Sequence, residues 1–219
     1  MASGTMSFLR IPIVLLAAGD LALLAVRLRP WPEIVNLPVQ GTSGFDPAIC
    51  LAVYIVLLFW MGGSRDDKVQ RALGSGVALA IPAGLLCVGF VYLSEQHSQQ
   101  MLYMQIGVLV AASICWGLAG MRGAKLANSP NVGIATGVWS AMISALMAGA
   151  VILARIDLNN PPAQSTDPWK QYQGLAIGNS VTQGLVNSLN TASGFLLLGP
   201  LAGAAAGLLF AFFGQNQKS

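Results

Sequence analysis

Asp20 is the residue whose type and position most suggest chemistry. It lies near the middle of an apolar run between Arg10 and Arg29, and no other Asp, Glu, Lys, Arg or His falls in the interior of the membrane spans predicted below. An ionised carboxylate at the centre of a bilayer costs roughly 2.5 to 3.5 kcal/mol on insertion scales. We therefore expect Asp20 to face the helix bundle and to be protonated or hydrogen-bonded.

Two roles for Asp20 stay open. It could couple to a proton or a cation, or it could form a polar contact that fixes how two helices pair. The second role is favoured, because a proton pathway usually needs further titratable groups. Arg27 is seven residues away, about 10 Å along a helix, which is too far for a direct ion pair. The uncharged candidate donors are Ser75, Gln105, Ser113, Thr136, Ser140 and Ser144.

Other catalytic or metal-binding patterns are missing from the sequence. His97 is the only histidine, which excludes bis-histidine haem ligation, Ser-His-Asp catalysis and Cys-His catalysis within one chain. Cys50, Cys87 and Cys115 are widely spaced in apolar runs, so we expect buried thiols, with a Cys50–Cys87 bridge as the minor alternative. The sequence thus predicts no cofactor, no metal and no enzymatic activity.

Two series of small residues predict close helix packing. Small residues four apart lie nearly in line on a helix and let a neighbouring backbone approach closely. One series lies in the segment 195–213, which has no ionisable residue in 19 positions, and the other lies in the preceding apolar segment. The predicted helix-packing residues are Gly133, Gly137, Ala141, Ala145 and Gly149 in the earlier segment and Gly199, Gly203 and Gly207 in the later one.

Composition places the chain among polytopic membrane proteins. Hydrophobic residues make up 55% of it and charged residues 9%, where a soluble domain has about 25% charged residues. The formal net charge of +3 is spread over short connectors, so we expect no nucleic-acid binding. The expected partners are the lipid bilayer and other membrane protein subunits or further copies of the chain.

The hydropathy pattern predicts an all-α bundle, a single integral membrane domain over 1–219 with six spans. Between the last two spans, 155–193 is expected to be a polar loop. Within that loop, 168–192 has the pattern of an interfacial amphipathic helix, or of a helix that leads directly into the last span. The predicted spans are about 9–28, 48–62, 72–93, 101–120, 132–154 and 195–213.

Lysine and arginine positions predict the orientation. If the N-terminus is inside, the inner segments hold seven of these residues and the outer segments hold four. The positive-inside rule therefore favours cytoplasmic termini, and we expect a bacterial inner membrane protein.

Two functions are compatible with these features. The first is a non-enzymatic integral membrane subunit or accessory protein of a larger assembly, packed through its small-residue stripes. The alternative is a small solute or ion carrier, or a membrane substrate-binding component, that uses Asp20.

The orientation can be tested by labelling in intact cells. In a cysteine-free background, a cysteine at Ser165 should react with an impermeant thiol reagent and a cysteine at Ser129 should not, because the first belongs to an outer loop and the second to an inner one. Labelling of the Ser129 position from outside would overturn the predicted topology.

Overall fold

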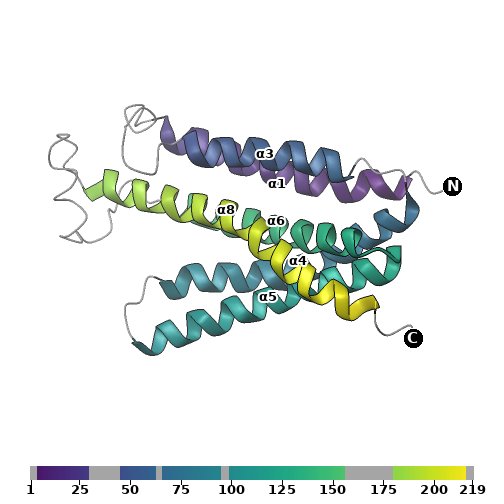
Figure 1. The fold of residues 1–219 in the computed structure, drawn as a ribbon. Helices are drawn as coiled ribbons and strands as arrows, with labels where there is room; N and C mark the ends of the chain where they lie inside the picture. The colour runs from purple at the N-terminus through teal and green to yellow at the C-terminus, as the bar shows by residue number, and fades with distance from the viewer. Residues whose placement is uncertain (1–3, 30–44, 63–65, 95–98, 156–179, 216–219) are drawn as a thin grey trace.

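The computed structural model describes residues 4–29, 45–62, 66–94, 99–155 and 180–215. Every regular element in these ranges is an α-helix, which confirms the predicted all-α class for this part of the chain. The helices alternate in direction, so the first turn of α1 and the last turn of α8 lie at the same end of the bundle (Figure 1). They are α1 (Gly4–Leu28), α3 (Phe45–Gly62), α4 (Asp67–Ser94), α5 (Gln99–Ala127), α6 (Pro130–Ala154) and α8 (Ser180–Gln215).

Among the described residues, four helices are long and apolar enough to cross a membrane. They supply the segments Asp67–Ser94, Gln100–Ala127, Pro130–Ala154 and Ser188–Phe213, each of 25 to 28 residues. Pro47–Leu57 in α3 is a shorter apolar stretch within the residues described. By length and composition, the chain is therefore a multi-pass helical membrane protein.

Capping residues explain why α4 and α5 extend beyond the spans predicted for them. The span 72–93 was predicted for this part of the chain, but α4 begins at Asp67, because the Lys68 amide donates a hydrogen bond of 2.8 Å to Asp66 Oδ1. This is the N-cap arrangement, which satisfies a free amide of the first turn. Helix α5 continues to Ala127, and Asn128 ends it in the left-handed conformation, with φ of 53°.

Helix α8 is relevant to the two alternatives left open for 168–192, an interfacial helix or a helix that leads directly into the last span. Residues 180–192 are the beginning of a single helix of 36 residues, so this part leads directly into the last span. The rest of the predicted interfacial helix, 168–179, lies outside the described residues. Pro200 lies inside α8, which continues through it, and 195–199 is helical as a full crossing requires.

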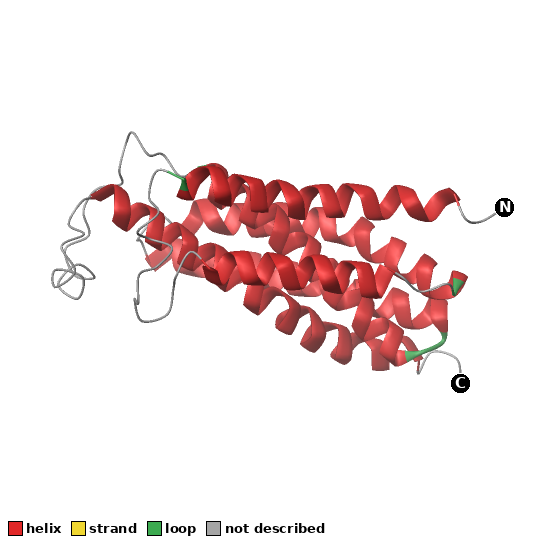
Figure 2. Cartoon of the chain, turned by 90° about the horizontal axis from the view of Figure 1, so that it is seen from above, coloured by secondary structure: helices red, strands yellow, loops and turns green. Residues whose placement is uncertain are grey.

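Helix α6 is the centre of the bundle. It contacts each of the other five described helices. Within its apolar stretch of 18 residues, 72% of the residues are buried, against 17 to 33% in the corresponding stretches of α4, α5 and α8. Helices α4, α5 and α8 pack closely around it, whereas α1 and α3 form a pair that contacts the bundle mainly through α6 and α8. Figure 2 shows the helices running roughly along one common direction.

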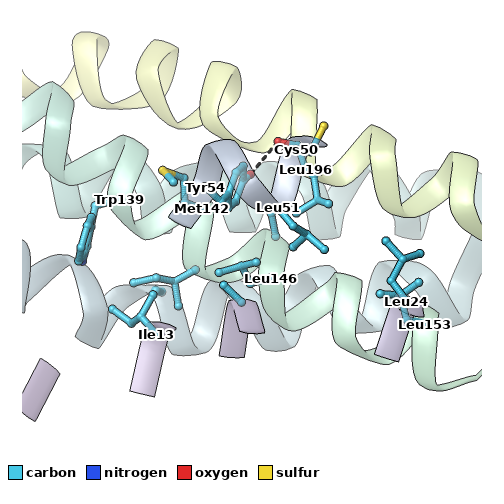
Figure 3. Packing of buried hydrophobic residues seen from close by; sticks show 14 of the residues in the cluster. Ile13, Leu24, Cys50, Leu51, Tyr54, Trp139, Met142, Leu146, Leu153 and Leu196 are labelled. Atoms are coloured by element: carbon cyan, nitrogen blue, oxygen red, sulfur yellow. Dashed lines mark hydrogen bonds between the residues drawn. The ribbon is translucent and has the colours of Figure 1, made fainter. Parts of the chain in front are cut away.

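Tyr54 joins the α1–α3 pair to α8 at a weak point of that helix. Proline has no amide hydrogen, so Pro200 leaves the carbonyl of Leu196, four residues earlier, without its helical partner. The Tyr54 hydroxyl donates a buried hydrogen bond of 2.7 Å to the Leu196 carbonyl oxygen (Figure 3). A side chain of α3 therefore satisfies the acceptor that the proline exposes, as membrane helices require.

We expect Tyr54→Phe to lower the free energy of unfolding by about 1 to 3 kcal/mol, because a buried carbonyl loses its donor. Thermal unfolding in detergent would measure the change, with Tyr103→Phe on the exposed surface as the control. In a Pro200→Ala background the restored amide can serve Leu196, so the same substitution should cost less. Equal costs in both backgrounds would contradict this account of the bond.

Candidate functional site

Asp20 lies on the buried face of α1. It shares this face with Ile13, Ala17 and Leu24, which occupy positions seven and three residues before it and four residues after it, as expected for one side of a helix. The side chain is only 1% exposed. The carboxyl group points toward Gly149 of α6, where an added Cβ would lie 3.5 Å from Asp20 Oδ2.

Within the part of the chain that the structure describes, the Asp20 carboxyl group has no hydrogen-bond partner. Both Oδ1 and Oδ2 are buried and unpaired. None of the six candidate donors named from the sequence forms a hydrogen bond with the Asp20 carboxyl group. Ser140 Oγ has no partner, and the others bond to carbonyl oxygens: Ser75 to Ala72, Gln105 to Leu93, Ser113 to Leu109, Thr136 to Val132 and Ser144 to Ser140.

Arg27, the charged residue nearest along α1 among those described, is also engaged elsewhere. Its Nη2 donates to the carbonyl oxygen of Ala154 at 3.0 Å, at the carboxyl end of α6, where a positive charge is favoured by the helix dipole. The Arg155 guanidinium lies 4.2 Å from the centre of the Tyr92 ring. Helix α6 contains no charged residue, so the surface that faces Asp20 offers no counter-charge.

Ser144, a candidate donor to Asp20, instead forms hydrogen bonds within the bundle interior. Its hydroxyl accepts a hydrogen bond of 3.2 Å from Trp116 Nε1 on α5 and lies 3.1 Å from the Ala80 carbonyl oxygen on α4. It therefore ties α4, α5 and α6 together through polar contacts in the bundle interior. Trp139 Nε1, on the same helix, is buried without a partner.

The two predicted stripes face each other in the structure. A Cβ added at Gly137 would lie 2.7 Å from the Gly203 carbonyl oxygen and 2.9 Å from Gly207 Cα. A Cβ added at Gly203 would meet the Ala141 methyl group and lie 2.8 Å from the Gly137 carbonyl oxygen. The α6 and α8 backbones are thus in direct contact, which only small residues permit.

Helix α5 joins this contact through Gly120, which is not among the helix-packing residues predicted from the interval of four. A Cβ at Gly120 would lie 2.7 Å from Gly207 Cα, and one at Gly133 would lie 2.7 Å from the Gly120 carbonyl oxygen. Three helices therefore meet at glycines. The signal was present in the small residues Gly117, Gly120 and Gly123, which recur at intervals of three rather than four.

Gly149 differs from the other members of its stripe, because it faces α1 instead of α8. Four residues of a helix advance by about 400°, so a series at this interval drifts by about 40° per step. From Gly133 to Gly149 the drift reaches about 160°, which turns the end of the stripe toward another neighbour. Ala145 still faces α8, with its Cβ 3.1 Å from the added Cβ position at Gly199.

The cysteines do not form a bridge. None of Cys50, Cys87 and Cys115 is in a disulfide, so the alternative of a Cys50–Cys87 bridge is wrong. Among the described residues no group of three or more His, Cys, Asp or Glu side chains could hold a metal ion. His97 lies outside these residues.

We expect Gly137→Ala to destabilise the folded protein by about 1 to 3 kcal/mol, because the new methyl group would press on the α8 backbone, which cannot move independently. Gly107→Ala is the matched control, since nothing lies within 4 Å of a Cβ added there. Thermal unfolding of both variants in detergent would measure the difference. Equal stability of the two variants would show that α6 and α8 do not touch at Gly137.

Asp20→Leu should unfold at a temperature at least as high as the unchanged protein. The substitution removes an unpaired buried polar group and leaves no former donor unsatisfied. Asp20→Asn is the comparison, because it keeps the shape but also keeps a buried polar group. A loss of more than about 1 kcal/mol in Asp20→Leu would reveal a hydrogen-bond partner for the carboxyl group.

Comparison of the chain with protein-family models, curated proteins and solved structures finds no match.

Proposed function

We propose that this protein is a non-enzymatic membrane carrier in which Asp20 binds a proton or a small cation. The observation that carries the proposal is the state of the Asp20 carboxyl group, which is 1% exposed and has no partner for either oxygen among the residues that the structure describes. A buried polar group without a hydrogen bond costs free energy that packing does not return. Intramembrane ionisable residues of this kind often mark ion or substrate paths.

The position of α1 also favours a role in binding. Helix α1 packs on α6 and α3 and is not one of the four helices that pack closely together. A site between a loosely attached helix and the centre of the bundle can open by moving one helix, without disturbing the glycine contacts among α5, α6 and α8. This arrangement would let Asp20 meet water during transport.

Six spans with cytoplasmic termini complete the proposal. In addition to the four apolar helices, α1 has 25 residues and α3 has 18, which correspond to about 37 and 27 Å, close to the hydrocarbon thickness of about 30 Å. The first turn of α1 and the last turn of α8 lie at the same end of the bundle (Figure 1), which supports an even number of crossings. The excess of Lys and Arg in the inner segments supports cytoplasmic termini in a bacterial inner membrane.

The alternative is a non-enzymatic subunit or accessory protein of a larger assembly. The small-residue stripes suggested it at first, since they could have packed against another chain. In the structure Gly137, Gly203 and Gly207 pack α6 and α8 within the chain, so these residues no longer indicate a partner. Native purification followed by mass spectrometry separates the two functions, because co-purifying proteins favour a subunit and a retained small molecule favours a carrier.

Ion flux in proteoliposomes tests the proposed function. We expect the purified protein to dissipate an imposed gradient of protons, Na⁺ or K⁺, measured with entrapped fluorescent indicators, and we expect Asp20→Asn to abolish that flux while keeping the fold. Asp67→Asn, an exposed carboxylate of α4, is the matched control and should retain the flux. A folded protein that carries none of the three ions, or an Asp20→Asn variant with full flux, would contradict the proposal.

A further inference from the structure

We infer that the ion at Asp20 is a proton and that the site does not bind a metal cation. This inference rests on the proposed function, and it concerns which ion the same carboxyl group takes. The two ions need different surroundings. A hard metal cation must replace most of its hydration shell by oxygen ligands, whereas a proton needs a single oxygen atom.

The surroundings of Asp20 provide too few oxygen ligands for a metal cation. Calcium takes about six to eight oxygens and magnesium about six. Across from Asp20, Gly149 contributes no side chain, and α6 is a regular helix there, so its backbone carbonyls are committed to helical hydrogen bonds. Among the described ranges, no hydroxyl or amide donates to the carboxyl group or lies at hydrogen-bond distance from it to complete a shell.

The groups that face Asp20 also give no support to a negative charge. From α6 there is no charged side chain, and Arg27 of α1 is held by the Ala154 carbonyl oxygen. From α3, the Tyr54 hydroxyl donates to the Leu196 carbonyl oxygen. The neutral carboxylic acid is therefore the form that this closed arrangement accommodates, because an unpaired buried carboxylate has no compensation.

Proton exchange then follows from one balanced step. The O–H bond of the Asp20 carboxylic acid breaks, the proton passes to a water molecule to form hydronium, and a carboxylate remains; the reverse step restores the acid. Because the closed bundle does not solvate the carboxylate, release requires water to reach Asp20. Movement of α1 away from Gly149 would admit that water.

Infrared spectroscopy of the full-length protein in liposomes tests the inference directly. At neutral pH we expect a carboxylic acid C=O band that is present in the unchanged protein, absent from Asp20→Asn and retained in Asp67→Asn. The band should be the same in Na⁺, K⁺ and choline buffers and should disappear at high pH. Absence of the band at neutral pH in folded protein, or its loss when Na⁺ or K⁺ replaces choline at constant pH, would overturn the inference.

Ion substitution in the flux measurement separates failure of this inference from failure of the proposed function. We expect proton flux to persist at an unchanged rate when choline replaces all Na⁺ and K⁺. Flux that follows Na⁺ or K⁺ and depends on Asp20 would retain the carrier and overturn the proton assignment. Without any flux, the carrier proposal fails, while the infrared band still decides whether Asp20 holds a proton.

Discussion

The close approach of other backbones to α6 is the constraint on which the rest of the structure depends. Lipid supplies no hydrophobic drive for helix association, so the helices associate through van der Waals contacts between their backbones. Small residues at the interface permit this close approach. Gly137 admits α8, Gly133 admits α5, and Ser144 adds polar contacts to α4 and α5. A Cβ at any of these glycines would press on backbone or on a fixed methyl group.

The lack of a side chain at Gly149 also makes room for the Asp20 carboxyl group, the candidate site. At Gly149 the small-residue series has turned away from α8, and the space next to it is taken by the carboxyl group of Asp20. The glycine contacts hold α5, α6 and α8 together without help from α1, so α1 is free to carry a group that does not stabilise the fold. An unpaired carboxyl group is tolerable there because the remaining bundle does not depend on it.

The sequence was a good guide to the helices and a poor guide to the contacts between distant side chains. Uninterrupted apolar runs predicted the helical segments, and the interval of four predicted Gly137 and Gly203 as members of stripes. The cap at Asp66, the continuity of α8 and the donor from Tyr54 to Leu196 depend on local geometry or on contacts between distant residues, which spacing does not encode. For the same reason, the sequence offered six donors to Asp20, and the structure places none of them within reach.

The central claim, that the Asp20 side chain is held against Gly149 at the centre of the bundle, can be measured by oxidative cross-linking. In a cysteine-free background, Asp20→Cys combined with Gly149→Cys should form an intramolecular disulfide in membranes, because an added Cβ at Gly149 lies 3.5 Å from the Asp20 side chain. Leu21→Cys with Gly149→Cys is the matched pair, since Leu21 is exposed on another face of α1. The account predicts cross-linking of the first pair and not of the second, and the opposite result would contradict it.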